Sequence, residues 1–301
     1  MLKSLFRAAK AVTPGPVRDL VDRAYLGALD LLPLRTGLQV RYFKSYQRLP
    51  RLDHPQLFSE KCQALKLLRP DLGRWVDKVA VKDFVRARVG DEFVIPTLYA
   101  GPALPPREAR TWPTPYVIKT NHGSGGNIFV RTEPDWPAIE QQLAAMLAYD
   151  FSSVSGETFY GTIPRQVLVE PFIADGPDLP LDYKVFTCGG EPQFIQVDTD
   201  RELAHKRVFF DAKWQRLPIR LGYPDDSRPI VRPQQLDRIL ELARTLSRGF
   251  GFVRVDFYEV GGRVYFGEMT FTPESGLMRF EPDSVDAELG AQWPWPPTFP
   301  S

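Results

Sequence analysis

Cysteine and histidine are scarce in this sequence of 301 residues. The two cysteines, Cys62 and Cys188, lie far apart and have no CxxC spacing, so the sequence indicates neither a disulfide framework nor a zinc site. The three histidines, His54, His122 and His205, form no metal-ligand pattern either. We therefore expect a protein of a reducing compartment and assign it to the cytoplasm.

A long hydrophobic run is also missing. The longest apolar tract near the start, YLGALDLLPL, is interrupted by Asp30 and Pro33 and is too short to span a bilayer. The first ten residues contain no cleavable apolar region of useful length, so we expect neither a membrane span nor export. The net charge of +1 gives no general reason to expect a nucleic-acid partner. A hydrophobic content of 43% with 25% charged residues is typical of a soluble globular protein.

The charge is unevenly distributed along the chain. Residues 1 to 51 contain ten lysines and arginines against three aspartates, a net charge of +7, which leaves −6 for the remaining residues. A basic helical extension of this kind, taken as residues 1–56, suits peripheral contact with the inner face of an anionic membrane or with a polyanionic polymer. A solvated helical face without a partner explains the same pattern.

Pairs of predicted strands alternate with single helices after residue 56, which favours an α+β fold with antiparallel sheets. Helical spacing of apolar residues predicts a helix that opens at a Ser59 N-cap, a helix that ends at a Gly90 C-cap, and helices over 134–149 and 233–249. Strands are predicted at FVIPTLY, YVIKT, IFVRT, RQVLVEPFI, DYKVFTCGGEPQFIQVD, RVFFDAKWQRL and FVRVDFYEVGGRVYFGEMTF. Prolines cluster at the end, so residues 286–301 are expected to form an irregular tail.

In the stretch YVIKTNHGSGGN, residues 116–127, a strand ends near Lys119 and a turn with three glycines follows. Glycines let backbone N–H groups approach a phosphate, and Lys119 adds a compact positive charge. In a Walker loop, however, the lysine follows the glycines and opens a helix, and the spacing does not fit GxGxxG before a helix. The stretch is either a phosphate-binding hairpin of another kind or an ordinary structural turn.

The hairpin at residues 252–271 places charged side chains on otherwise apolar strands. Arg254 and Asp256 share one face of the first strand, and the return strand carries Glu268 and Thr270. Such oxygen ligands suit Mg²⁺ that bridges phosphate oxygens, whereas the alternative is an Arg254–Asp256 pair on a solvated face. Asp256 faces Glu268 only across a three-residue loop that includes Arg263, so the metal-site hypothesis predicts this longer, bulged turn.

Four further candidate residues carry weaker signals when each is taken alone. Glu170 ends the strand VLVEPFI, which has the sequence of an ordinary core strand. Lys184 lies between apolar neighbours in LDYKVF and is either paired or exposed. Lys78, in VDKVAVK, has the pattern of a solvated lysine, and His122 lies in a polar loop without a second histidine nearby.

The order of these segments along the chain resembles the ATP-grasp superfamily. More closely, FSEKCQALKLL, VDKVAVKDFV, VIKTNHGSGGN, LDYKVF and RVDFY…VYFGEMTFTPESG resemble the TupA-like ATP-grasp family, named for teichuronopeptide biosynthesis. The resemblance runs from about residue 57 to 280. It implies an ATP-grasp domain over 57–285, in which a glycine-loop subdomain of about 93–170 and a metal-binding subdomain of about 171–285 grip ATP between antiparallel sheets.

The resemblance also implies roles for single residues. Lys119 and Lys184 would bind the phosphates of ATP with help from Lys78, and Arg254 together with Lys184 would act on the transferring phosphoryl group. Other ATP contacts would come from His122, Gly123, Ser124, Gly125 and Gly126 in the loop, and from Glu170, Phe172 and Ile173 at the hinge. The ligands of Mg²⁺ would be Asp256, Glu268 and Thr270. Superfamily members usually have Glu-x-Asn where this chain has Glu268-Met269-Thr270, and a hydroxyl is a weaker ligand than an amide carbonyl.

The implied activity is an ATP-dependent ligation of a carboxylate to an amine through an acylphosphate, in the synthesis or modification of a cell-surface polysaccharide. This chemistry requires positioning and charge neutralisation rather than a covalent nucleophile. Arg201, Lys206 and Arg207 in DRELAHKR would hold an anionic substrate, or else lie in a solvated loop. Two alternatives are a kinase of a sugar or polyol and a non-catalytic ATP-binding component of a polysaccharide assembly complex.

Overall fold

The computed structural model describes residues 29, 31–123, 126–176, 178–200 and 204–300. Within these residues the fold is α+β, and the strands that form the sheets pair antiparallel, as the sequence predicts. The helices, with the short 3₁₀ turns marked η, are α3 Leu34–Tyr46, α4 Phe58–Leu68, α5 Gly73–Val76, α6 Val81–Val89, η1 Asp91–Phe93, η2 Arg107–Ala109, α7 Trp136–Ala148, α8 Phe151–Ser155, η3 Thr158–Thr162, α9 Leu236–Ser247, η4 Pro273–Gly276 and α10 Ser284–Gln292. The strands are β1 Tyr99–Gly101, β2 Tyr116–Thr120, β3 Ile128–Val130, β4 Val167–Pro171, β5 Asp182–Cys188, β6 Glu191–Thr199, β7 Lys206–Phe210, β8 Arg216–Leu217, β9 Arg220–Leu221, β10 Phe252–Val260, β11 Arg263–Thr270 and β12 Phe280–Glu281.

The larger sheet has six strands in the order β11-β10-β5-β6-β7-β8. Successive side chains of a strand point to opposite faces, so Val253, Val255 and Phe257 of β10 share one face and Arg254 and Asp256 share the other. The apolar face packs against α9, whose buried leucines supply the other half of this core. The strand alternation therefore separates a hydrophobic face from a face that carries charge.

The charged face of this sheet is closed by aromatic residues at one end. Phe58 of α4 packs edge-on against Phe252, with ring centroids 4.8 Å apart, and Trp293 lies 4.8 Å from the same ring. Phe186 of β5 belongs to the same cluster. Arg254 comes two residues after Phe252 on β10, and Lys184 comes two residues before Phe186 on β5. Residues two apart on a strand share a face, so the charged residues begin where the aromatic cluster ends.

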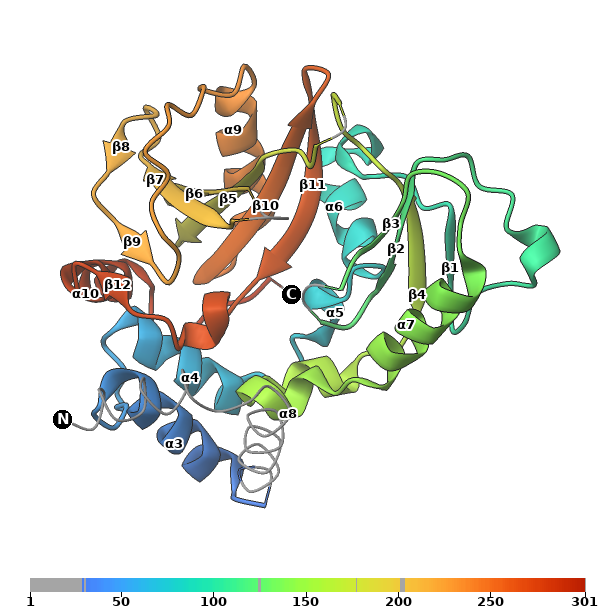
Figure 1. The fold of residues 1–301 in the computed structure, drawn as a ribbon. Coiled ribbons are helices and arrows are strands. Elements are labelled where there is room, and N and C mark those ends of the chain that lie inside the picture. The colour runs from blue at the N-terminus through green and yellow to red at the C-terminus, as the bar shows by residue number, and fades with distance from the viewer. Residues whose placement is uncertain (1–28, 30, 124–125, 177, 201–203, 301) are drawn as a thin grey trace.

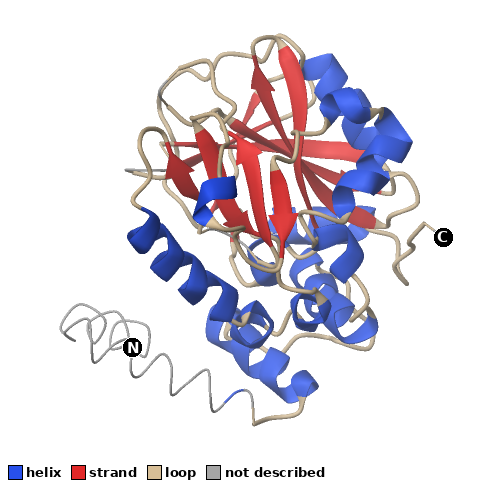
Figure 2. Cartoon of the chain, turned by 90° about the vertical axis from the view of Figure 1, so that its right-hand side faces the viewer, coloured by secondary structure: helices blue, strands red, loops and turns tan. Residues whose placement is uncertain are grey.

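The smaller sheet has four strands in the order β1-β4-β2-β3. Ile118 and Val169 are buried at its centre, and Ile139 and Leu143 of α7 pack against it to form a separate core. Figure 1 shows the two sheets side by side, with α5 and α6 between them. Figure 2 shows the strands gathered in the upper part of the molecule and helices below them and along one side.

Two predicted boundaries are wrong. The helix α4 begins at Phe58 with Leu57 as N-cap, because the carboxylate of Glu60 accepts the backbone N–H groups of Gln56 and Leu57 at 3.1 and 3.2 Å. Ser59, expected as the N-cap, instead lies in the first turn and donates its hydroxyl to Asp286 at 2.7 Å. The start of the expected irregular tail is helical, because residues 286–292 belong to α10, which packs against α4.

A ribbon of two strands, β9 and β12, links the segment after the large sheet to the segment after η4. Beyond α10 the described chain has no helix or strand, although Trp293 is only 1% exposed. Among the described residues, no helix combines the length and the hydropathy needed to cross a membrane.

Candidate active site

The register of three strands brings the predicted metal ligands together. Asp256 of β10 pairs with Lys184 of β5 on one side and with Glu268 of β11 on the other. The register holds because a bulge shifts the pairing between Asp256 and Phe257, which leaves Gly267 as the extra residue on β11. The three side chains consequently share one face of the large sheet.

The predicted three-residue turn is wrong. Val260 pairs with Arg263, so the loop contains only Gly261 and Gly262, with φ angles of 59° and 71°. These angles suit the two-residue turn that glycine pairs form most easily. The extra residue needed to place Asp256 opposite Glu268 therefore lies inside β11, not in the loop.

Arg254 and Asp256 form a buried pair, which excludes the solvated pair considered above. Arg254 donates from Nε and Nη2 to the two carboxylate oxygens of Asp256, at 2.7 Å each, and the two residues are 6% and 2% exposed. Nη2 of Arg254 also lies 3.0 Å from Oγ1 of Thr270 and 3.4 Å from Oε1 of Glu268. One guanidinium thus contacts all three predicted metal ligands.

Lys184 is paired rather than exposed. Its Nζ donates to Asp182 at 2.5 Å and to Asp256 at 2.9 Å, and lies 3.9 Å from Asp198 of β6. Burial lowers the pKa of Lys184, but Asp182 and Asp256 raise it further, so the net shift is upward. The side chain is therefore a cation at neutral pH.

The pKa values of the two carboxylates on this face, Glu268 and Asp256, shift in opposite directions. Burial raises the pKa of Glu268, but Lys78, Arg254 and Lys184 outweigh burial and bring it to about 2. Burial raises the pKa of Asp256 against the opposing effect of Arg254 and Lys184. Glu268 is the more accessible of the two, with its side chain 32% exposed against 3% for Asp256.

Glu170 is a buried anion held by two lysines on the smaller sheet's side of the site. Its carboxylate pairs with Lys119 of β2 and, at 2.5 Å, with Lys82 of α6. Burial raises the pKa of Glu170, but the two lysines lower it by more. The sequence prediction included Lys119 and Glu170 but missed Lys82, whose only signal was a lysine inside the apolar stripe of α6.

Lys78 joins the two sides of the site. Its Nζ donates to the carbonyl of Gly123 in the glycine hairpin and lies 3.8 Å from Oε2 of Glu268 on β11. Its backbone N–H donates to the carbonyl of Asn121 at 3.2 Å, which ties the segment before α6 to the hairpin. Lys78 is thus a bridge between the glycine hairpin and the predicted metal strand, not a solvated helical lysine.

The glycine hairpin is described on either side of its tip. Gly123 and Gly126 have backbone φ angles of 129° and 71°, which residues that carry a Cβ atom rarely adopt. His122 is 2% exposed and meets Phe151 edge-on at 6.0 Å, so it is a buried residue whose pKa burial lowers. Ser124 and Gly125, also predicted to contact ATP, lie outside the described residues.

The predicted hinge, residues 170–173, begins in the last two residues of β4 and continues beyond it. The backbone N–H of Phe172 donates to the carbonyl of Pro115 at 3.0 Å, and its ring meets Phe129 at 5.7 Å with the guanidinium of Arg131 over it at 5.4 Å. Phe172 and Ile173 are half-buried. The hinge therefore lies beside β2 and β3, on the small-sheet side of the cluster.

The predicted substrate residues separate into different environments. Arg207 is 3% exposed and pairs with Asp198 at 2.7 Å and Glu274 at 2.9 Å, which excludes a solvated loop for this residue. Lys206 is half-buried, 3.7 Å from Asp200. Arg201 lies outside the described residues.

Glu274 and Ser275 are site-adjacent residues that the sequence analysis missed. Both have left-handed backbones, with φ of 50° and 55°, directly after β11. Lys66 of α4 holds this turn, because its buried Nζ donates to the carbonyls of Ser275 and Ser155 at 2.8 and 2.9 Å. Burial lowers the pKa of Lys66 to about 8. The segment TPESG is their sequence signal, although a left-handed Glu-Ser pair is not predictable from residue preferences.

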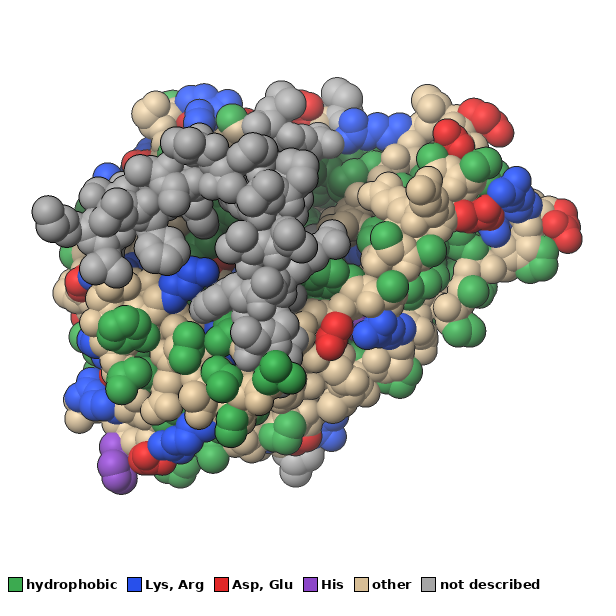
Figure 3. All heavy atoms as spheres, turned by 60° about the horizontal axis from the view of Figure 1, so that its bottom comes forward, with side chains coloured by type: hydrophobic (Ala, Val, Ile, Leu, Met, Phe, Trp, Pro, Cys, Tyr) green, Lys and Arg blue, Asp and Glu red, His purple; other side chains and the backbone are tan. Residues whose placement is uncertain are grey.

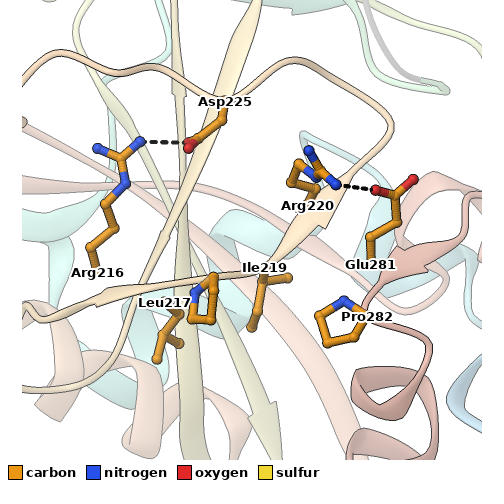
Figure 4. Close-up of a pocket in the computed structure, with 8 residues that line it drawn as sticks. Arg216, Leu217, Ile219, Arg220, Asp225, Glu281 and Pro282 are labelled. Atoms are coloured by element: carbon orange, nitrogen blue, oxygen red, sulfur yellow. Dashed lines mark hydrogen bonds and ion pairs between the residues drawn. The ribbon is translucent and has the colours of Figure 1, made fainter.

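A pocket of about 690 Å³ lies elsewhere, between β8, β9 and β12. Figure 4 shows its two ion pairs, Arg216 with Asp225 at 2.6 Å and Arg220 with Glu281 at 2.7 Å, on either side of apolar residues that include Leu217 and Ile219. Its cations are neutralised by their own partners, and none of its lining residues belongs to the charged cluster described above.

Comparison with protein families gives one match that covers most of the chain. Residues 60–293 match the family described as TupA-like ATPgrasp. None of the curated proteins matches the sequence.

Several solved structures are similar in fold at low sequence identity. A D-alanine–D-alanine ligase from Bacillus anthracis has a TM-score of 0.42 at 14% identity, over 75% of this chain and 71% of that chain. The corresponding ligase from Helicobacter pylori has a TM-score of 0.38 at 17% identity, over 74% of this chain and 61% of that chain. The ATP-grasp ligase PsnB, in complex with a minimal precursor, has a TM-score of 0.36 at 9% identity, over 65% and 51%.

Proposed function

Because the chain belongs to the TupA-like ATP-grasp family, we propose that it is an ATP-dependent ligase that joins a carboxylate to an amine. The proposed setting is the cytoplasm, at a step in the synthesis or modification of a cell-surface polysaccharide. The proposed reaction has two steps. A carboxylate oxygen attacks the γ-phosphorus and ADP leaves; the amine nitrogen then attacks the acyl carbon, phosphate leaves and the amine loses a proton.

The observation that carries the proposal is the position of Lys78. It contacts the carbonyl of Gly123 and lies 3.8 Å from Glu268, so the glycine hairpin and the end of β11 meet around one cation. Lys119 comes from β2 and Lys184 from β5, and their charges act on the two partners of this contact, Lys119 on Lys78 and Lys184 on Glu268. A triphosphate needs several cations that converge from different elements, and this is where the described chain gathers them.

We assign a magnesium ion to the oxygen ligands on β10 and β11. Two carboxylates, Asp256 and Glu268, face each other across the strand pair, and the hydroxyl of Thr270 lies 2.9 Å from Oε1 of Glu268. Mg²⁺ is commonly held by one or two carboxylates while phosphates and waters complete its shell. Bound Mg²⁺ would supply charge neutralisation at the phosphate oxygens. The low pKa of Glu268, about 2, keeps this carboxylate ionised for that purpose.

The proposed work of the side chains is electrostatic. Arg254 is fixed by Asp256 in a two-point contact, so its guanidinium is oriented before any substrate binds. We assign it, with Lys184, to the transferring phosphoryl group. Lys119 and Lys78 are assigned to the phosphates that remain with ADP, and the backbone of Glu170 to Ile173 to the adenine edge. No covalent nucleophile is required, because positioned cations lower the barrier.

The experiment that tests this proposal measures ADP and phosphate release from Mg·ATP by the purified chain. Uronic acids and amino acids are supplied singly and in pairs, and products are identified by mass. The proposal expects phosphate release that requires both a carboxylate and an amine, with an amide product. A phosphorylated sugar or polyol would identify a kinase instead. Binding of ATP without turnover under any pairing would favour a non-catalytic role, for which the hydroxyl of Thr270 in place of an amide ligand is the motivation.

Variants assign the turnover to the described residues. Lys119→Ala and Asp256→Asn are each expected to lower kcat/KM by about 100-fold or more, since each removes a charge beside the reacting phosphates. Cys188→Ser is the matched control, because Cys188 lies on β5 of the same sheet and its thiol lies in the hydrophobic core, where it donates to the carbonyl of Leu289 at 3.9 Å. Equal activity in all three variants would refute the site assignment.

A further inference from the structure

Large hydrophobic side chains are exposed along one segment at the N-terminal side of the fold. Within residues 31–49 five of them reach the surface: Leu31 at 87%, Leu32 at 39%, Val40 at 37%, Phe43 at 49% and Leu49 at 61%. The other large hydrophobic side chains exposed in the described chain are Leu68, Tyr149 and Val231, which lie far apart along the chain. Isolated exposed hydrophobic residues are ordinary, whereas a concentration of five in nineteen positions is not.

The fold does not need this apolar surface. Helix α3 already buries Leu38 and Tyr42, both at 0% exposure, against the rest of the protein. Val40 and Phe43 are three residues apart, so they lie together on the opposite side of the helix. Helix α3 thus has apolar side chains on its core-facing side and two more on its solvent-facing side. Exposing Val40 and Phe43 to water has a free-energy cost that a partner would remove.

Basic residues surround the exposed apolar side chains. Arg35, Arg48 and Arg51 have side chains 47%, 41% and 50% exposed, and Arg35 pairs with Asp53 at 2.5 Å. Arg48 and Arg51 share a single carboxylate, that of buried Glu60, so two guanidiniums face one anion. Residues 31–51 contain five lysines and arginines and no aspartate or glutamate. The segment thus combines apolar side chains with an excess of positive charge.

A pocket of about 400 Å³ lies next to this segment. Three arginines, Arg48, Arg51 and Arg279, line it together with the carboxylates of Asp283 and Asp286, and Arg279 pairs with Asp283 at 2.8 Å. Guanidiniums pair well with phosphate oxygens, so a lipid phosphate at this pocket would exchange with the carboxylates that now hold the arginines. The bottom of Figure 1, where α3 lies, faces the reader in Figure 3, and hydrophobic side chains there are interspersed with Lys and Arg.

We propose that residues 31–51, called the α3 face, dock on an anionic lipid bilayer. Phe43, Val40 and Leu49 enter the headgroup region, while Arg35, Arg48 and Arg51 lie against lipid phosphates. The α3 face contacts α4, and the hydroxyl of Tyr46 donates to the carbonyl of Met278, two residues beyond η4, at 2.9 Å. Because the α3 face is packed on the rest of the protein, its binding to a bilayer would fix the position of the whole fold relative to the membrane. The proposal does not depend on the ligase function.

The test is sedimentation of the full chain with vesicles of phosphatidylcholine, with or without phosphatidylglycerol. The chain is expected to bind only the phosphatidylglycerol vesicles and to dissociate when NaCl rises from about 0.1 to about 0.5 M, because salt screens the charge. Val40→Glu with Phe43→Glu is expected to weaken partitioning about tenfold or more, since two anchors become anions. The matched control is Leu68→Glu with Val231→Glu, exposed apolar positions off the α3 face.

Each outcome decides the proposal. Undiminished binding by the Val40→Glu, Phe43→Glu variant would overturn it, because residues before the α3 face would then suffice. Equal loss in the control pair would also overturn it. If the chain instead forms a dimer that the Val40→Glu, Phe43→Glu variant abolishes, the face is a self-association surface. Thermal melts of both variants should match the parent chain, because all four positions are exposed.

Discussion

Lys78 shows how much of the candidate site depends on single side chains. It occupies the segment before α6, yet its Nζ contacts the glycine hairpin and its charge lies beside Glu268 of β11. A buried lysine loses hydration, and burial lowers the pKa of Lys78 below its ordinary value of 10.5. The neighbouring carboxylate of Glu268 acts in the opposite direction. The charge of Lys78 is therefore sensitive to alkaline pH.

The pKa of Lys78 leads to a pH prediction. The cation is present below the lowered pKa and is lost as pH rises through it, so kcat/KM for ATP should begin to fall at a pH below 10.5. Lys78→Arg, whose guanidinium stays charged, should move this fall to higher pH. Lys213→Arg, at an exposed position, is the control. Coincident alkaline limbs for the Lys78→Arg variant and the parent chain would contradict a phosphate-binding role for Lys78.

At the scale of elements, the β-bulge in β11 sets the chemistry of the site. A one-residue change of register turns every side chain of a strand to the opposite face. Without the bulge at Gly267, Glu268 would leave the face that carries Asp256 and Lys184. The bulge requires a small residue, because a Cβ on Gly267 would lie 3.1 Å from the carbonyl oxygen of Asp256 and 3.1 Å from the ring of Tyr258.

Gly267→Val tests this dependence. The added side chain is expected to lower the free energy of unfolding by about 1–3 kcal/mol through overpacking. ATP turnover should be lost even in the fraction of the protein that remains folded, because Asp256 and Glu268 would no longer face each other. Gly176→Val is the control, since a Cβ there meets nothing within 4 Å. The measurements are urea denaturation and phosphate release, and retained turnover in folded Gly267→Val protein would show that the register is dispensable.

The elements were largely predictable from the sequence because their signals are local. Alternation gave β5 and β10, and helical spacing gave α9 and α6, each within a few residues of the observed ends. The Ser59 cap was wrong because Asp286, far along the chain, takes the hydroxyl. The position of the bulge was wrong because it depends on β10 and β11 packing between η1 and β5, which no local pattern encodes.

The candidate site was less predictable than the elements. Lys119 and Asp256 were identified because charged residues on apolar strands are conspicuous. Glu170 became a candidate only through the family resemblance, and the roles that the resemblance supplied remain predictions. Lys82 and Glu274 were missed because their partners come from other elements: Glu170 on β4 and Arg207 on β7. Ion pairs across elements follow from tertiary structure, not from spacing along the chain.

For the whole molecule, the irregular chain after α10 is part of the core. Trp293 is 1% exposed and lies 5.6 Å from Phe58 of α4 and 4.8 Å from Phe252 of β10. It therefore joins the N-terminal helices to the large sheet. Its contacts come from segments nearly two hundred residues apart, which makes this position a sensitive probe of global stability.

Trp293→Ala is expected to lower the free energy of unfolding by about 3–5 kcal/mol, because a large buried ring leaves a cavity. Gln292→Ala, at the neighbouring exposed position, should change it by less than about 0.5 kcal/mol. Both values come from urea unfolding monitored by circular dichroism. A small effect of Trp293→Ala would mean that the end of the described chain is not integral to the core.

The two buried cysteines are built-in chemical probes of local unfolding in this core. Cys62 lies in α4 and Cys188 in β5, both buried and unpaired with each other, and burial raises the pKa of both thiols. An aqueous alkylating reagent reaches neither while the helices cover the sheet. The labelling rate therefore reports the frequency of local unfolding. Peptide mass spectrometry distinguishes labelling of Cys62, which reports unfolding of α4, from labelling of Cys188, which reports opening of the large sheet.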